Sequence, residues 1–222
     1  MELAKPALDV GLYTNKVDDM LACWQEQAQV SYSELLKLGG GVHQHRHAIG
    51  ASVLKINHIR EPLASDQPCG LRKLTIFADF VDEPVDLLDP DGNELSLAPA
   101  TSDSPNLCLI LACNDVAAQA DFYGRVLGLP RTEAGRFRVG ASEIELVPGQ
   151  VGPFERVATG YRYMTFQVFD VVGTHRAILT AGGREGSAPV RLGDVAYISF
   201  VLDAEGNWLE ISQRKSITGS LD

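Results

Sequence analysis

The chain has 222 residues, 45% of them apolar and 22% charged, a composition typical of a soluble globular protein with one large or two small domains. Its formal net charge of −10 disfavours nucleic acid and membrane surfaces as partners. The N-terminus MELAKPALDV lacks the apolar stretch of a signal peptide, and the four cysteines have no CxxC spacing. We therefore expect a cytoplasmic protein with reduced thiols and no membrane span.

The first half of the chain predicts a strand at Leu8–Thr14 and a helix at Val17–Gln27, where apolar residues recur at helical spacing. Three more predicted strands complete a β-α-β-β-β order, and a second unit follows in which the helix is shrunken to FVDEPVD. The predicted strands of these two units are Tyr32–Leu38, Val42–Ile49, Ser52–Ile59, Leu71–Asp79, Val85–Leu88 and Glu94–Leu97.

The second half follows the same scheme, and its tail KSITGSLD is expected to be mobile. Its predicted elements are the strand Leu107–Ala112, the helix Val116–Leu127, the hairpin Arg136–Val147, the strand Tyr163–Val168, the helix Val171–Ala181 and the strands Ala196–Leu202 and Trp208–Ser212.

Four pairs of segments occur in the same order in the two halves, which predicts a duplicated domain. RHAIGASVLKI from Arg46 matches RFRVGASEIEL from Arg136, and RKLTIFADF from Arg72 matches RYMTFQVFD from Arg162. LDPDGNELSL matches LDAEGNWLEI, and LDVGLYTNKVDDMLACW resembles LCLILACNDVAAQADFY. The spacer APATSDSPN is typical of a linker. We therefore predict domains at residues 7–100 and 106–214.

The segment CNDVAAQADFYGRVLGLP and the closing turns DPDGNELSL and DAEGNWLEI resemble those of the vicinal oxygen chelate superfamily. This superfamily includes glyoxalase I, bleomycin-resistance proteins, methylmalonyl-CoA epimerase and extradiol dioxygenases. The resemblance implies an α+β fold of four tandem βαβββ modules, one with a shrunken helix, that form two curled-sheet domains around clefts. The modules pair either within one chain or across a homodimer, and the sequence leaves this choice open.

Metal-using members of the superfamily place ligands at the start of the first strand and late on the last strand of each module. The resemblance puts these points at Asp9, Lys55, Lys73, Ser96, Cys108, Glu145, Tyr163 and Glu210. The two histidines and one carboxylate of an iron dioxygenase are not present at these points. Lysine is not a usual metal ligand, but it binds carboxylate or phosphate well.

Three of the five histidines, His43, His45 and His47, alternate along one predicted strand and therefore share one face. His58 ends the next strand, and we expect Asp9 and Lys55 to line the same cleft as these histidines. Three interpretations stay open: sheet histidines without a chemical role, a metal or acid–base site, and a metal-free pocket for an anion. Imidazole suits Zn, Fe, Ni or Cu, and its pKa lies near working pH.

The leading hypothesis is an enzyme with lyase, isomerase or dioxygenase chemistry. It would act on a small oxygenated anionic substrate through a metal-stabilised enolate-type intermediate, with its site in the first half. The alternative is a non-catalytic small-molecule binder of the bleomycin-resistance type. A divalent metal (Zn, Fe, Ni or Mn) is the candidate cofactor. The candidate residues are His45, His47 and His58 for catalysis, Lys55, Lys73 and Tyr13 for substrate binding, and His43, His45, His47, Asp9, Glu145 and Glu210 for metal binding.

Overall fold

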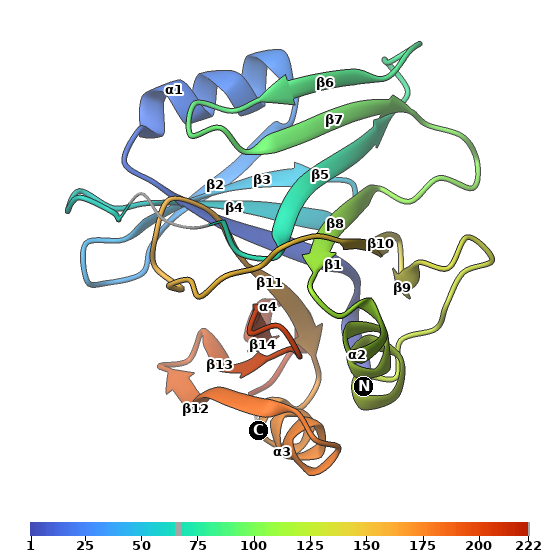
Figure 1. Ribbon diagram of the computed structural model, residues 1–222. Coiled ribbons are helices and arrows are strands. Elements are labelled where there is room, and N and C mark those ends of the chain that lie inside the picture. Colours follow the sequence, from blue (N-terminus) through green and yellow to red (C-terminus); the bar gives the residue numbers. More distant parts are fainter. Residues whose placement is uncertain (65–67, 222) are drawn as a thin grey trace.

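The computed structural model describes residues 1–64 and 68–221, and the strands in these ranges form two sheets of eight and six strands. In Figure 1, sheet A runs from the orange and red strands to the blue and cyan ones, and sheet B is the teal to olive group. In spatial order, sheet A consists of β12 (Arg184–Leu192), β13 (Ala196–Leu202), β14 (Trp208–Arg214), β11 (Gly160–Val168), β1 (Leu3–Thr14), β4 (Ser52–His58), β3 (His43–Ile49) and β2 (Ser31–Lys37). Sheet B consists of β6 (Val85–Leu88), β7 (Glu94–Pro99), β5 (Leu71–Ala78), β8 (Leu107–Cys113), β10 (Ser142–Pro148) and β9 (Phe137–Val139).

Each sheet combines one module from each half of the chain. In sheet A the first module joins the fourth where β1 and β11 pair antiparallel, and in sheet B the second joins the third where β5 and β8 do so. The α+β fold of curled sheets built from βαβββ modules is thus confirmed, and within the described chain the modules pair intramolecularly. The sheets do not coincide with the predicted ranges 7–100 and 106–214, whose standing as folding units stays a prediction.

The two halves of the chain meet at the turns that the sequence repeat predicts. Ser52 and Ser142, which close the two Gly-Ala-Ser turns, are hydrogen-bonded through their hydroxyl oxygens at 2.8 Å. Gly140, in the second turn, has a positive φ, and a side chain there would collide with the Pro6 carbonyl. This close approach explains why the turn requires glycine.

The three predicted long helices are confirmed, but the first two each end in a π-helical turn. The helix α1 (Val17–Ala22) continues as η1 (Cys23–Gln27), and α2 (Val116–Asp121) continues as η2 (Phe122–Val126). The same deviation in both halves supports a duplication. The third helix, α3 (Val171–Thr180), begins after Asp170, whose carboxylate caps the amide of Gly173.

Two elements differ from the sequence prediction. Strand β12 was not predicted, because REGSAPVRL is polar and irregular, as suits an edge strand that is mostly exposed. The tail is also more ordered than predicted: Lys215–Thr218 forms the short helix α4, and Leu221 is buried. Gln213 donates a hydrogen bond to the Ser220 carbonyl at 3.1 Å, which fixes this turn.

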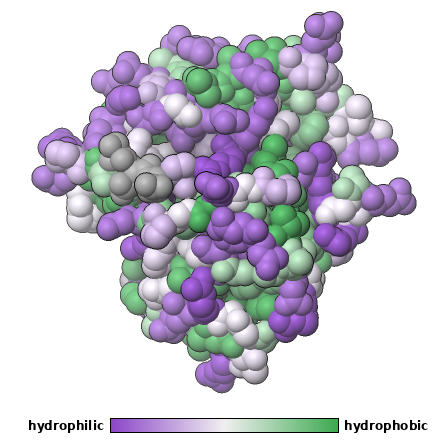
Figure 2. All heavy atoms as spheres, in the orientation of Figure 1, coloured by the Kyte–Doolittle hydropathy of each residue, from purple (hydrophilic) through white to green (hydrophobic). Residues whose placement is uncertain are grey.

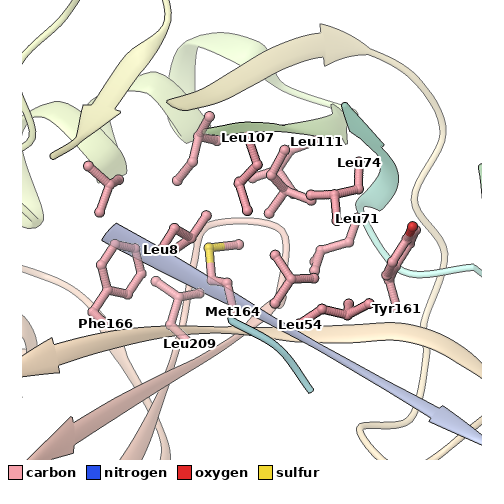
Figure 3. Close-up of a cluster of buried hydrophobic side chains, with 14 of the residues drawn as sticks. Leu8, Leu54, Leu71, Leu74, Leu107, Leu111, Tyr161, Met164, Phe166 and Leu209 are labelled. Carbon is pink, nitrogen blue, oxygen red and sulfur yellow. The ribbon is translucent and has the colours of Figure 1, made fainter. Parts of the chain in front are cut away.

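The hydrophobic core lies between the two sheets and under the helices. Figure 3 shows side chains from sheet A facing side chains from sheet B across this space. The labelled residues are Leu8, Leu54, Tyr161, Met164, Phe166 and Leu209 on one side and Leu71, Leu74, Leu107 and Leu111 on the other. The opposite face of each sheet is therefore free to form a cleft.

The surface of the molecule is mostly hydrophilic on the face shown in Figure 2, with smaller hydrophobic patches between the hydrophilic residues. The four cysteines are buried and not joined by disulfides. Within residues 1–64 and 68–221, no helix is both long and apolar enough to span a membrane.

Candidate functional site

Three polar side chains meet at the centre of the cleft face of sheet A. The Lys55 ammonium on β4 donates to Thr165 Oγ1 on β11 and to Glu210 Oε2 on β14, both at 2.7 Å. The Thr165 hydroxyl also lies 2.7 Å from the same carboxylate oxygen. Lys55 is the register neighbour of Gly11 on β1, and its side chain reaches past this strand to Thr165 on β11. The cluster thus joins modules from the two halves of the chain.

The charges in this cluster are nearly removed from water. The side chains of Lys55 and Glu210 are 4% and 13% exposed. Burial opposes ionisation of Glu210, but the charge and hydrogen bond of Lys55 and the hydrogen bond of Thr165 outweigh it, so the pKa of Glu210 is lowered. The cleft therefore contains an ammonium–carboxylate pair with both groups charged.

Aromatic side chains extend the cleft beside this pair. The Tyr163 ring packs on Gly11, with the Lys55 ammonium 5.5 Å from its centroid, and its hydroxyl accepts from Asn57 Nδ2 at 3.1 Å. Burial raises the pKa of Tyr163 well above its ordinary value. Tyr13 stacks at 6.1 Å from Tyr163, and its pKa is also raised by burial. Both phenols therefore stay protonated at ordinary pH.

A cavity of about 430 Å³ opens over the pair. Its floor is polar, and its mouth is lined by apolar residues from β2 and from the turn between β12 and β13. The lining residues are Leu36, Lys37, Leu38, Gln44, Lys55, Leu192, Val195, Ala196, Ile198, Glu210, Ser212 and Arg214. This shape, an apolar wall around a few polar groups, is typical of a small-molecule site.

A divalent metal does not fit the side chains at this point. Glu210 is paired with the Lys55 ammonium, and Asp9 Oδ1 accepts from the Lys5 ammonium and from the amide of Val53. Asp9 Oδ2 is buried without a hydrogen-bond partner, yet a cation there would meet the Lys5 ammonium that already pairs with this carboxylate. In the part of the chain that is described, no three His, Cys, Asp or Glu side chains form a group able to hold a metal ion. At this point of the cleft the cation beside Glu210 is the Lys55 ammonium.

The predicted histidine cluster lies on the opposite face of sheet A. His43, His45 and His47 do share one face, and His43 pairs with His58 across the hairpin. Lys55, however, pairs with Arg46, so its side chain and those of the histidines point to opposite sides of the sheet. The expectation that these histidines line the same cleft as Asp9 and Lys55 is therefore wrong.

The histidines pack under the first helix. His47 is fully buried, and its Nε2 lies 3.2 Å from Gln25 Nε2 on η1. Burial lowers the pKa of His47 to about 4, and burial and neighbouring histidines lower the pKa of His45 and His58. Tyr32 contacts the rings of His45 and His47. These contacts make His45 and His47 part of the packing layer beneath the first helix.

The remaining predicted residues lie on sheet B. Lys73 pairs with Asp86 at 2.7 Å, and Glu145 pairs with Arg136 at 2.7 Å. Cys108, on the same face, is buried, and burial raises its pKa to about 12, so it remains a thiol. The structure thus brings Asp9, Tyr13, Lys55 and Glu210 to one face of sheet A and leaves Lys73 and Glu145 elsewhere.

Two cleft residues were missed from the sequence. Thr165 lies two positions after Tyr163, on the same face of β11. Placing the superfamily's ligand point two residues later on this strand would have identified it. Arg214 lines the cavity at the end of β14, four positions after Glu210. Every second residue of a strand lies on the same face, so Arg214 shares the cleft face with Glu210. Nothing in the sequence distinguishes Arg214 from the other arginines.

The architecture defines a class: paired βαβββ modules curled around clefts. Residues 106–211 match the family model of the Glyoxalase/Bleomycin resistance protein/Dioxygenase superfamily. This part of the chain therefore belongs to that superfamily, and the first half repeats its scheme and completes the fold. The resemblance noted in the sequence is confirmed. No curated protein matches the chain.

Several solved structures have the same fold over nearly the whole chain. Glyoxalase I from Zea mays has a TM-score of 0.76 at 13% identity, covering 96% of this chain and 92% of that one. A dioxygenase-like protein from Bacillus subtilis subsp. subtilis str. 168 has a TM-score of 0.69 at 11% identity, covering 100% and 91%. The cppA protein from Streptococcus pneumoniae TIGR4 has a TM-score of 0.59 at 9% identity, covering 96% and 100%. At these identities the likeness concerns the fold.

Proposed function

We propose that the chain is an enzyme of this superfamily that binds a small oxygenated anion in the sheet A cleft. In this proposal the Lys55 ammonium stabilises an enolate-like oxyanion of the substrate. The observation that carries it is the buried Lys55–Glu210–Thr165 cluster on the floor of the cavity. Lys55 and Glu210 also stand at two of the points where the resemblance places the superfamily's ligands.

The physical basis is electrostatic preorganisation. A cation that is already held in place pays little reorganisation energy when negative charge develops on a substrate oxygen, and poor access of water strengthens the attraction. Glu210 and Thr165 hold the Lys55 ammonium from one side, which leaves the cavity side for the substrate. Glu210, ionised beside it, is the proposed acceptor of the α-proton. The ammonium takes the role that the sequence hypothesis gave to a metal.

Deuterium exchange tests this proposal without knowledge of the substrate. Small 2-oxo and 3-oxo acids are incubated with the protein in D2O, and loss of the α-proton signal is followed by NMR. We expect protein-dependent exchange for at least one acid, reduced about 10²- to 10³-fold in Lys55→Met, the scale of losing one oxyanion donor. Lys73→Met, on sheet B, is the matched control and should exchange at the wild-type rate.

The alternative, a non-catalytic binder, is favoured by one observation. Tyr13, Tyr163 and Phe200 form a cluster beside the cleft, with Trp208 packed on it and the Arg156 guanidinium 4.6 Å from the Phe200 centroid. Such a surface suits a planar ligand. Ligands that bind with micromolar affinity while no acid exchanges or turns over would replace the enzyme proposal with this one.

A further inference from the structure

We infer that the sheet A cleft takes an amphipathic anion, with its charged head on Arg214 and an apolar tail between two apolar rims. The inference rests on the proposed function, because it names the substrate class of the same cleft. It concerns binding specificity, whereas the proposed function concerns what Lys55 does to a bound substrate.

Arg214 is a cation without a counter-charge in direct contact. Its guanidinium lines the cavity and is only partly exposed, and burial and the charge of Arg46 lower its pKa. Among the residues that the structure describes, no carboxylate forms an ion pair with Arg214. A partly buried, unpaired guanidinium is costly, and a bound carboxylate with two oxygens matches its planar fork.

The charges that line the cavity select an anion. Lys37, Lys55 and Arg214 contribute three positive charges, and Glu210 contributes one negative charge that Lys55 already neutralises. This positive cleft lies in a chain whose net charge is −10. A local field of opposite sign to the whole protein indicates a specific ligand rather than general surface composition.

The mouth of the cavity is apolar on two opposing sides. Leu36 and Leu38 line it from β2 and the turn after it, and Leu192 and Val195 line it from β12 and the turn before β13. Leu38, Leu192 and Val195 are 52%, 45% and 62% exposed. Large apolar side chains exposed around one cavity gain free energy when an apolar ligand group covers them.

Calorimetric titration with straight-chain carboxylates tests the inference. Butanoate, hexanoate and octanoate keep the head constant and lengthen the tail, and hexanamide keeps the tail and removes the charge. We expect affinity to rise about two- to fourfold per added methylene, as partial to complete burial of each group requires. Hexanamide should bind at least about tenfold more weakly than hexanoate, because it lacks the charge-assisted pair with Arg214.

Two variants separate the head from the tail. Arg214→Gln should abolish the preference for hexanoate over hexanamide and keep the dependence on chain length. The double variant Leu38→Ser, Val195→Ser should flatten the chain-length dependence and keep the preference for carboxylate. Phe80→Ser, which removes an apolar side chain of similar exposure (51%) outside this cavity, is the control and should bind all ligands as the wild type does. Circular dichroism and thermal melting verify the fold of each variant.

The outcomes distinguish this inference from the proposed function. Equal affinities for butanoate and octanoate, no detectable carboxylate binding, or an Arg214→Gln variant that still prefers carboxylate would each overturn the inference. α-Proton exchange that depends on Lys55 would then keep the proposed function. If affinity rises clearly with chain length but no acid exchanges its α-proton, the inference about the ligand holds and the protein is the non-catalytic binder of the alternative.

Discussion

The outer faces of sheets A and B are built by the same modular scheme but hold opposite charges at equivalent points. Lys55 on β4 corresponds in the sequence repeat to Glu145 on β10, and each lies near an arginine of its own hairpin. In sheet A, Lys55 pairs with Glu210 from the other half of the chain, with 4% and 13% of the side chains exposed. In sheet B, Glu145 pairs locally with Arg136, with 34% and 33% exposed.

The difference between the two ion pairs explains why the face of sheet A, and not the similar face of sheet B, is the candidate site. The pair in sheet A is assembled only when distant modules meet, and it is desolvated, so its field acts strongly on anything that enters the cavity. The pair in sheet B joins neighbouring strands and is screened by water, as an ordinary surface ion pair is. Substitutions in the two pairs test this contrast.

Breaking the two pairs should have very different effects on stability. Glu210→Gln leaves the Lys55 ammonium buried and unpaired, and we expect it to lower the free energy of unfolding by about 3–5 kcal/mol. Glu145→Gln removes a half-exposed partner and should cost no more than about 1 kcal/mol. Urea denaturation followed by circular dichroism measures both. Equal losses of unfolding free energy in Glu210→Gln and Glu145→Gln would show that the two ion pairs do not differ in desolvation.

A third variant separates the cost of an orphaned charge from the value of the pair. In Lys55→Met, Glu210→Leu both charges are replaced by apolar groups of similar size, so no buried charge is left unpaired. We expect most of the stability lost in Glu210→Gln to return, since well-packed apolar replacements of buried pairs are often neutral or stabilising. α-Proton exchange should not return, because the ammonium is still missing.

Much of the fold could be predicted because it depends on local patterns. Apolar periodicity located most strands and the three long helices, and the Gly-Ala-Ser repeat indicated the duplication. Lys55 and Glu210 were each predicted as site residues. Their ion pair was not, because it requires β1 to pair with β11, and the pairing of modules is a long-range choice that the local patterns do not determine.

The face of the histidines shows a second limit. Alternation predicted that His43, His45 and His47 share a face, but it does not say which face is the cleft. Phe137, the counterpart of His47, was the available indicator: it is buried and packs against Tyr123 of η2, on the helix side of sheet B. Its contact with Tyr123 places this face of the strand against the helix, in the core and not in the cleft.

His47 offers a prediction of intermediate size, based on the same counterpart. Its pKa is lowered from 6.5 to about 4, because burial disfavours the charged ring, so the unfolded chain binds a proton that the native state does not. The free energy of unfolding should therefore fall by on the order of 2 kcal/mol as pH decreases from about 6.5 to 4. Above pH 7 His47 is neutral in both states and causes no such loss. His47→Phe, which copies Phe137, should remove this part of the acid sensitivity.

Urea denaturation at pH 8, 6 and 4.5 gives the free energy of unfolding of the wild type and of His47→Phe. The effect of His47 is the change with pH of the difference between these two free energies. The lost contact with Gln25 lowers the stability of the variant about equally at each pH, so it cancels in this comparison. His175→Phe is a useful comparison, because His175 is also buried but contacts Ser199 and Glu185. Parallel pH profiles for the wild type and His47→Phe would contradict the neutral, buried state of His47.

The smallest expected effect concerns metal ions. The Lys55 ammonium already pairs with Glu210 in the sheet A cleft, so excess Zn²⁺, Ni²⁺ or Mn²⁺ should leave the melting temperature of the wild type unchanged. Lys55→His replaces the ammonium with an imidazole beside Glu210 and close to Asp9 on the same face. This variant should gain metal affinity and melt a few degrees higher with Zn²⁺ or Ni²⁺, since ligands that bind only the native state stabilise it. Lys73→His is the control in sheet B.

Elemental analysis of protein expressed with added metal completes the test. A near-stoichiometric metal in the wild type that Glu210→Gln releases would show that the ammonium is not the resident cation. A metal lost only in His45→Ala, His47→Ala would instead place it on the helix side of sheet A, where His47 is buried and its Nδ1 has no hydrogen-bond partner in the described chain. If the wild type holds no metal at either place and only Lys55→His binds one, Lys55 alone distinguishes this cleft from a metal-binding cleft.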